Sequence, residues 1–429
     1  MKLLLKGGRV VDPATKTDAV LDVLCEDGAI VKVAHDIPPG DAKVLAVKGL
    51  VVAPGFVDMH CHLREPGQEW KETIESGARA AAAGGFTAVA CMPNTVPVND
   101  ERSVTEFIRA RAREKACVRV YPIGAISKGL KGEELAEIGD LVAGGAVAVS
   151  DDGRPVVSGM LFRKVLEYAS MFDIPVIDHC EDLDLSDGGV VNEGIVSTVL
   201  GLKGWNHTAE EVMVFRDLTL ARETGGRVHI AHASTAGSVA LVRDARARGV
   251  KATIEVTPHH FALTEEACRD FDTRSKMNPP LRTEADRRAL LEGIADGTID
   301  AIATDHAPHH SDEKSVEFSR APFGIVGLET AVSLALDRLV ASGLIGLPRL
   351  VELFSAGPSR ILGLPGGRLA PGAPADITVL DTARTVVVDA SAFRSKARNT
   401  PFDGWSLKGG PVATIVGGVL VHDVLTSRA

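Results

Sequence analysis

The stretch Asp58-Met59-His60-Cys61-His62-Leu63-Arg64-Glu65-Pro66-Gly67 follows an apolar, β-branched segment, residues 50–57, that contains a Pro54-Gly55 turn. This composition predicts a buried strand that leads into the histidines. Side chains two positions apart on a strand share a face and lie about 6.5–7 Å apart. We therefore expect His60 and His62 to point the same way and to bind one metal ion, through bonds of about 2.0–2.1 Å. Two packed core histidines are the alternative reading.

The overall composition is that of a large globular protein. With 429 residues, the chain is longer than a typical single domain unless one domain is a barrel of about 250 residues. Hydrophobic residues make up 45% and charged residues 24%, as in soluble proteins with a large core. The net charge of −10, the absence of a basic run and only 4% aromatic residues argue against a nucleic-acid surface.

The cysteines and the apolar segments indicate the compartment. Six cysteines occur without a Cys-x-x-Cys pair, which fits a reducing cytosol better than a disulfide framework. The apolar run in residues 1–8 is too short for a signal peptide, and no window approaches about 18 apolar residues. We expect a soluble, cytoplasmic protein without membrane contact.

Both ends of the chain predict short β-strands. At the N-terminal end these are residues 3–5, 9–11, 19–25 and 29–34; at the C-terminal end they are 376–380, 385–388, 412–416 and 419–422. Neither end has enough strands for a confident core of its own. We therefore expect residues 1–53 and 364–429 to form one small, β-sandwich-like domain.

The middle of the chain, residues 54–363, alternates strand-like and helix-like segments. The predicted strands are 56–59, 87–91, 118–123, 146–149, 175–177, 227–231, 251–256 and 301–304. The predicted helices are 70–83, 103–115, 133–143, 159–171, 209–223, 238–248, 284–296 and 328–341. Eight such pairs indicate a (β/α)₈ TIM barrel. A doubly wound open sheet is the alternative, but no Gly-x-Gly-x-x-Gly turn follows the first strand.

Polar residues follow nearly every predicted strand on its C-terminal side, and in a barrel these ends meet at one mouth. Among them are four imidazoles suited to zinc and two carboxylates able to neutralise it: His60, His62, His179, His232, Asp152 and Asp305. Six such groups are more ligands than one tetrahedral zinc ion can take while it keeps a position open for water. They suit two ions about 3.5–4 Å apart that activate a shared water molecule.

Some choices between neighbouring residues stay open at this point. Asp151 and Asp152 lie on opposite faces of the fourth strand's end, and parity does not choose between them. His232 lies nearer its strand end than His229, which we expect to be packed. Four further histidines near the mouth are expected to be solvated loop residues: His259, His260, His306 and His310.

With these residues identified, the chain closely resembles the bacterial class I dihydroorotases of the amidohydrolase superfamily over essentially its whole length. The resemblance is carried by the segments 54–67, 91–95 (Cys-Met-Pro-Asn-Thr), 151–153, 178–182, 229–232, 276–282, 303–309 and 321–329. It implies reversible conversion of N-carbamoyl-L-aspartate to L-dihydroorotate plus water, in pyrimidine biosynthesis. It also implies Asp152 as the bridging ligand, because residues 145–150 offer no lysine for the carbamylated bridge that many relatives use.

The same resemblance implies roles for single residues. His60, His62 and Asp305 would hold one zinc ion and His179 and His232 the other, while Asp305 would act as general base and then as general acid. Substrate contacts would come from His62, Arg64, Asn94, Asn278, His309, Phe323 and Gly324. Among these, Arg64, Asn94 and His309 are the candidates to bind the substrate carboxylate that does not react. The segment Pro322-Phe323-Gly324 is expected to be a mobile cover, because glycine and short side chains around it allow movement.

Two competing interpretations remain. A hydantoinase or allantoinase shares the barrel, but it would be expected to have a bridging lysine. The carboxylate-binding residues Arg64, Asn94 and His309 would also have no role in such an enzyme. An inactive relative that serves aspartate transcarbamoylase as a structural partner would have lost metal ligands, and none is missing here. We also expect a homodimer, and an active enzyme could still associate with that transcarbamoylase.

Overall fold

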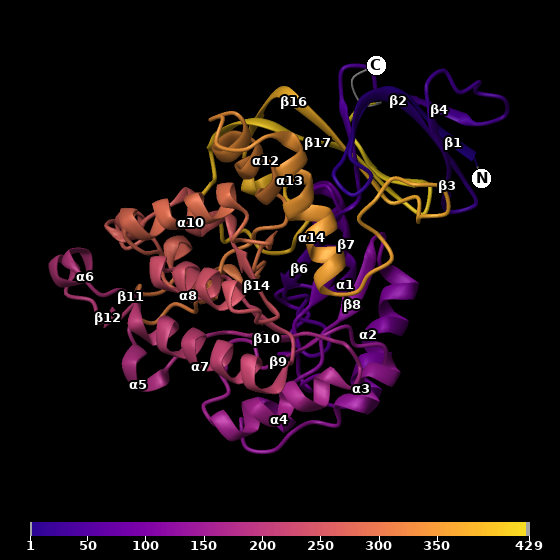
Figure 1. Ribbon diagram of the computed structural model, residues 1–429. Helices are drawn as coiled ribbons and strands as arrows, with labels where there is room; N and C mark the ends of the chain where they lie inside the picture. The colour runs from indigo at the N-terminus through magenta and orange to yellow at the C-terminus, as the bar shows by residue number, and fades with distance from the viewer. Residues whose placement is uncertain (1, 426–429) are drawn as a thin grey trace.

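Strands from the two ends of the chain pair in one eight-stranded sheet of the computed structural model, which describes residues 2–425 (Figure 1). The sheet order is β18-β17-β16-β5-β1-β2-β3, with β4 on β1. The strands are β1 (Lys2–Asp12), β2 (Thr17–Glu26), β3 (Ala29–Ala34), β4 (Lys43–Ala46), β5 (Val51–Pro54), β16 (Ile377–Val387), β17 (Ser406–Val416) and β18 (Val419–Asp423). Strand β5 joins the two halves because it pairs with β1 on one side and with β16 on the other.

Two strand predictions at the ends need correction. The segments 3–5 and 9–11 belong to one strand, β1, whose register against β2 shifts between Leu5 and Gly8. Likewise 376–380 and 385–388 are parts of β16, with a register shift between Asp381 and Thr385. At these points the strand pairing is irregular, and the alternation of the sequence is interrupted there as it would be at the end of a strand.

Parallel strands form the middle of the molecule. One sheet has the order β6-β7-β8 and another the order β15-β14-β13-β10-β9. The strands are β6 (Phe56–Cys61), β7 (Phe86–Cys91), β8 (Arg119–Pro122), β9 (Val149–Ser150), β10 (Val176–Asp178), β13 (Val228–Ile230), β14 (Ala252–Val256) and β15 (Ala301–Ile302). Single parallel bridges, Gly124–Val149 and Cys61–His306, link the edges of the two sheets. The eight predicted strands are thus present in order, but their ladders do not form one continuous closed sheet among the described residues.

Helices follow the parallel strands and surround them (Figure 1). They are α1 (Ile74–Ala83), α2 (Arg102–Lys115), α3 (Ile138–Gly144), α4 (Gly159–Ser170), α7 (Thr208–Thr224), α8 (Ala236–Ala247), α10 (Glu284–Asp296), α12 (Ala331–Ala335), α13 (Leu347–Val351) and α14 (Gly357–Ile361). Shorter elements are α5 (Leu183–Ser186), β11 (Val191–Asn192), α6 (Ile195–Leu200), β12 (Gly204–Trp205), α9 (Pro258–Ala262), α11 (Ser311–Lys314) and the 3₁₀ or π turns 128–130, 265–268, 273–275, 336–340, 352–356 and 390–392. None of the helices described is long and apolar enough to cross a membrane.

Three predicted helices differ from the observed ones for local reasons. The helix predicted at 70–83 begins at Ile74, because the Thr73 hydroxyl accepts from the Ser76 N–H and forms a capping box. The helix predicted at 133–143 begins only at Ile138, since the N–H of Ala136 is used by the Ile126 carbonyl. The last predicted helix, 328–341, is α12 continued by a π turn.

Gly55 connects the eight-stranded sheet to β6 and so positions the histidine strand. A Cβ at this residue would lie 2.2 Å from the Thr87 hydroxyl oxygen, so only glycine fits between β5 and β7. Below it, the buried rings of Phe56 and Phe354 stack with centroids 5.3 Å apart, and Phe86 meets Phe354 edge-on at 5.9 Å. This aromatic packing fixes the base of β6.

Candidate metal-dependent active site

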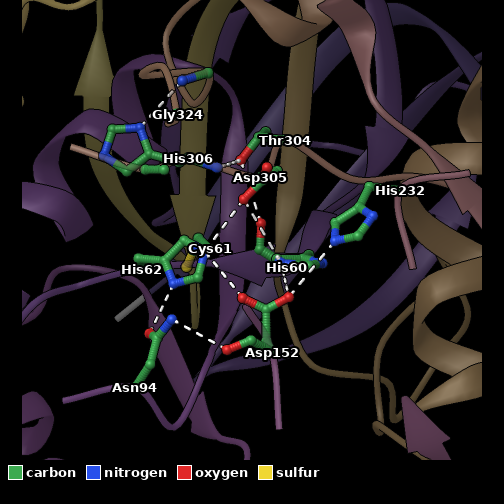
Figure 2. A network of polar contacts seen from close by, with 12 residues as sticks. His60, Cys61, His62, Asn94, Asp152, His232, Thr304, Asp305, His306 and Gly324 are labelled. Carbon is green, nitrogen blue, oxygen red and sulfur yellow. Dashed lines mark hydrogen bonds and ion pairs between the residues drawn. The ribbon is translucent and has the colours of Figure 1, made fainter. Parts of the chain in front are cut away.

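Six imidazole and carboxylate side chains lie together at the C-terminal ends of the parallel strands. His60 is on β6 and His62 follows it, while Asp152, His179, His232 and Asp305 follow β9, β10, β13 and β15. All six are buried. The structure therefore brings together residues from five separate segments of the chain. Figure 2 labels each of these six residues except His179.

Asp152 lies at the centre of this group. Its Oδ1 is 3.2 Å from His60 Nε2, 3.6 Å from His232 Nε2 and 3.7 Å from His179 Nδ1. Its Oδ2 is 3.5 Å from His62 Nε2. Figure 2 shows the carboxylate between His62 on one side and His60 and His232 on the other. One carboxylate thus contacts every histidine of the cluster, with a different oxygen for His62.

Asp305 and Asn94 orient His62. His62 Nε2 lies 3.1 Å from Asp305 Oδ1, and His62 Nδ1 lies 2.9 Å from Asn94 Oδ1. The ring centroids of His60 and His62 are 5.6 Å apart. The two histidines therefore share a face, with their Nε2 atoms turned towards the two aspartates.

His179 and His232 form the second pair. His179 Nδ1 is 2.8 Å from His232 Nε2, and His179 Nε2 is 3.2 Å from Glu181 Oε2. Both rings thus place a nitrogen near Asp152. A second carboxylate, Glu181, fixes the orientation of His179 from the other side, as partners of metal-bound histidines commonly do.

Several features fit a bound cation. His60 Nε2 and Asp152 Oδ1 are buried and make no hydrogen bond within residues 2–425, although they lie 3.2 Å apart. Buried polar atoms without a hydrogen-bond partner are rare unless they bind something else. The ligand atoms of His60, His62 and Asp305 lie within 4.8 Å of one another, as do those of His60, Asp152 and His232. These observations support a metal cofactor.

The backbone is strained at the same place. Arg64, His232 and Asp305 have positive φ angles of 59°, 31° and 46°, which residues with a Cβ rarely adopt. Strain of this kind persists where the surrounding structure imposes it, and it concentrates at functional sites.

The buried carboxylates of the cluster also favour a positive charge beside them. Burial opposes ionisation of Asp152, but the charge of His60 and the close contacts with His232 and His60 outweigh it and hold the pKa of this carboxyl well below its usual range. Burial likewise disfavours a charged His60, yet Asp152 and Glu255 raise its pKa well above the usual value. Without a cation, the carboxylates draw protons onto the imidazoles; a divalent ion supplies the same charge and competes with those protons.

Glu255, on β14, orients two histidines and was not identified from the sequence. Its Oε1 lies 2.8 Å from His60 Nδ1, its Oε2 lies 3.1 Å from His229 Nε2, and its side chain accepts from the His232 N–H. The only sequence signal was a single acidic residue inside an apolar strand. His229 is buried and also contacts Thr253, so its predicted packed position is confirmed.

Replacing Glu255 with glutamine should weaken metal binding by about 10–100-fold, because the carboxylate fixes the ring of His60 and makes it a better ligand. Titration of the metal-free variant against a competing chelator measures this. Glu266→Gln, an exposed glutamate paired with Arg269, is the control. Unchanged affinity in Glu255→Gln would contradict the orienting role.

A cavity of about 540 Å³ opens above the cluster. Its wall includes all the residues predicted to contact substrate: His62, Arg64, Asn94, Asn278, His309, Phe323 and Gly324. It also includes Arg154, which sequence reasoning did not single out. His309 Nε2 lies 2.8 Å from the Phe323 carbonyl oxygen, and Asn278 donates to Glu181 at 3.2 Å. Asp151 points elsewhere, to the N–H groups of Ile126 and Ser127.

Three of the four remaining histidines were misjudged. His259, His260 and His306 are only 2%, 3% and 1% exposed, so they are not solvated loop residues. His260 is held by Thr257 and the Pro279 carbonyl, and His306 by Glu72 and the Gly327 N–H. The partners that bury these side chains come from segments far away in the sequence, which sequence position alone does not reveal. His310 is exposed, as predicted.

Comparison with known proteins agrees with this geometry. A family model described as dihydro-orotase-like matches residues 49–238, and one described as amidohydrolase family matches residues 206–422. Dihydroorotase from Pelotomaculum thermopropionicum is 58% identical over 98% of this chain and 98% of its own length. Dihydroorotase from Acetivibrio thermocellus is 55% identical, again over 98% of each chain.

Solved structures of amidohydrolases show the same fold. L-Hydantoinase from Arthrobacter aurescens superposes with a TM-score of 0.89 at 25% identity, over 98% of this chain and 96% of that one. Dihydropyrimidinase from Brevibacillus agri, at 22% identity, has a TM-score of 0.87 over 99% of this chain and 95% of its own. The predicted architecture, a TIM-barrel fold with an additional β domain, is thus that of its structural relatives. On its sequence relatives, its fold and the grouping of its histidines and aspartates, the chain belongs to the dihydroorotase family of amidohydrolases, which hydrolyse cyclic amides.

Proposed function

We propose that this protein interconverts N-carbamoyl-L-aspartate and L-dihydroorotate plus water, in a site that holds two zinc ions. The observation that carries this proposal is the single carboxylate, Asp152, in contact with four histidines below a cavity of about 540 Å³. In this proposal His60, His62 and Asp305 hold one ion, His179 and His232 hold the other, and Asp152 bridges them. When bound, the ions polarise the amide carbonyl and lower the pKa of a water molecule.

Asp305 is the proposed catalytic residue. Its carboxylate lines the cavity and lies 3.1 Å from His62 Nε2. Burial opposes its ionisation, but the hydrogen bond with His62 and nearby imidazoles lower its pKa to about 2. In ring opening, Asp305 accepts the proton of the attacking water and passes it to the leaving ring nitrogen; in ring closure the same proton moves the other way.

Arg64, Asn94 and His309 are proposed to bind the substrate carboxylate that does not react. Arg64 donates from Nε to the Pro308 carbonyl at 3.3 Å, and its terminal nitrogens make no hydrogen bond within residues 2–425. A guanidinium offers two parallel donors that match a carboxylate. Asn94 lies beside it in the wall and is held by His62. Substrate position is thereby tied to a metal-binding histidine.

Asn278 and the backbone of Phe323 and Gly324 are proposed to bind the amide groups of the ring. Asn278 Oδ1 is buried and has no hydrogen-bond partner within the described residues, so it can accept from a ring N–H. Gly324 has a φ of 116°, and a Cβ there would lie 2.6 Å from the Ala307 side chain. Only glycine lets the backbone approach the cavity this closely.

Arg64→Met should raise KM for carbamoyl aspartate by about 10-fold or more, because an unpaired substrate carboxylate loses a charge-assisted hydrogen bond worth about 1.5–3 kcal/mol. Metal content should stay unchanged. Steady-state kinetics with elemental analysis measure both, and Arg79→Met, an exposed arginine paired with Glu75, is the control. An unchanged KM would refute the carboxylate contact.

An absorbance assay of dihydroorotate hydrolysis beside hydantoin and allantoin tests the function directly. We expect turnover of dihydroorotate at a kcat/KM at least about 100-fold higher than for the other two, since neither of them carries a free carboxylate for Arg64. Faster hydrolysis of hydantoin would restore the hydantoinase alternative, which the sequence relatives do not favour. Several expectations stay predictions. They are a homodimer, association with aspartate transcarbamoylase, a cytoplasmic location, a mobile cover at residues 322–324, and the domain bounds 1–53, 54–363 and 364–429.

A further inference from the structure

A second cavity of about 410 Å³ lies next to the proposed active site. His309 lines both cavities. The wall of the second cavity comes from four separate segments, residues 70–71, 272–274, 309–315 and 396–399. The volume is within the range of small-molecule sites, about 300–1,000 Å³. None of the six metal-ligand candidates is among its lining residues.

Positive charge dominates this wall. Lys71 pairs with Glu313 at 2.9 Å, and Arg274 pairs with Asp272, the only carboxylate among the lining residues, at 2.9 Å. The other cationic side chains of the wall donate to main-chain carbonyls and have no carboxylate at ion-pair distance within residues 2–425: Lys314, Lys396 and Arg398. Carbonyl oxygens satisfy their N–H groups but do not neutralise their charge.

The pKa values of two buried groups at this wall, Lys314 and His309, are lowered mainly by burial and then by neighbouring cations. The Lys314 ammonium donates to the Thr273, Lys276 and Pro322 carbonyls at 3.0, 3.3 and 2.7 Å. Burial, and then the charge of Lys276, outweigh the opposite effects of Asp272 and Glu313 and lower the pKa of Lys314 to about 7. Burial, and then Arg64, Lys314 and Lys71, lower the pKa of His309 to about 2. Both groups resist a further positive charge, so an anion in the cavity would be stabilised.

An aromatic surface adjoins these cations. Trp70 lines the cavity and is 56% exposed, which is unusual for so large an apolar side chain. Lys396 Nζ donates to the carbonyl of Glu69, the residue before Trp70, so the ammonium and the indole belong to the same part of the wall. An exposed indole beside uncompensated cations suits a ligand with a planar ring and a negative group.

We propose that this cavity binds a nucleoside monophosphate, with the phosphate on Lys396 and Arg398 and the base on Trp70. An arginine fork and a lysine ammonium are the usual donors to a phosphate. The ring stacks on the indole without reading a particular base, because every base has a π face.

Binding here should weaken substrate binding, and this part of the inference rests on the proposed function. His309 lines both cavities, so a phosphate in one and a substrate carboxylate on Arg64 in the other repel each other as like charges. The coupling is reciprocal, so substrate should weaken nucleotide binding by the same factor. KM for carbamoyl aspartate should therefore rise with nucleotide to a plateau.

Isothermal titration of the metal-loaded protein with uridine 5′-monophosphate tests the site without measuring activity. We expect a Kd below about 1 mM, with uridine and inorganic phosphate each binding at least about 10-fold more weakly. The double variant Lys396→Met/Arg398→Met should lose about 10-fold or more in affinity. Trp70→Ala, which removes an exposed side chain and leaves folding undisturbed, should lose affinity for the nucleotide but not for phosphate. Lys128→Met/Arg79→Met, at exposed ion pairs elsewhere, is the control.

No binding at 10 mM nucleotide, about ten times the largest Kd expected, would overturn the proposal. So would equal affinity in the wild type and both cavity variants, or phosphate binding as tight as nucleotide binding. In the kinetics, inhibition that grows linearly without a plateau and persists in the double variant would place the nucleotide in the active site instead.

Discussion

Asp305→Asn is expected to lower kcat for both directions of the proposed reaction by about 10²–10⁴-fold, the usual contribution of a positioned general acid–base group. Asparagine keeps the size of the side chain and one oxygen that can face His62, which lies 3.1 Å from the Asp305 carboxylate. It cannot carry the proton between the water and the ring nitrogen. Steady-state kinetics in both directions measure the loss.

Metal content and folding have to be measured on the same sample, because Asp305 is also a proposed ligand. We expect Asp305→Asn to keep most of its metal by elemental analysis and to unfold near the wild-type temperature. Asp312→Asn, in α11 after the same strand and 89% exposed at its side chain, is the matched control and should be fully active. Near-normal turnover in Asp305→Asn would remove its acid–base role.

Removal of metal should abolish turnover, since no side chain of the cavity replaces the Lewis acid of a two-metal site. Protein purified without chelator should contain close to two zinc ions per chain, as the two overlapping ligand groups around His60 suggest. Dialysis against a chelator should reduce activity by about 10³-fold or more, and added zinc should restore it. Activity and elemental analysis are followed on the same dialysis series.

Asp152→Ala distinguishes a bridging carboxylate from a merely adjacent one. Because Asp152 contacts all four histidines, its loss should leave fewer than two ions per chain even at saturating zinc. Asp173→Ala, 90% exposed at its side chain, should bind the full complement. One firmly bound ion with full activity in the wild type would refute the two-metal mechanism.

Sequence periodicity predicted the order and type of the main elements well, because each is determined by local patterns. The eight apolar strands of the middle region alternate with amphipathic helices, and the strand ends carry the six metal-ligand candidates. Boundaries were less accurate: the capping of α1 by Thr73 and the hydrogen bond between Ala136 and Ile126 decide where two helices begin.

The sequence therefore contained the ligand set, since a TIM-barrel fold brings histidines and aspartates at the carboxyl ends of its parallel strands to one mouth. The partners that orient the set emerged from three-dimensional packing alone. Glu255 contacts His60, which lies 195 positions away in the chain. The sequence around a single glutamate in an apolar strand does not show which residue it contacts. The burial of His259 and the cationic cavity beside His309 likewise arise from contacts between distant segments, which no local pattern encodes.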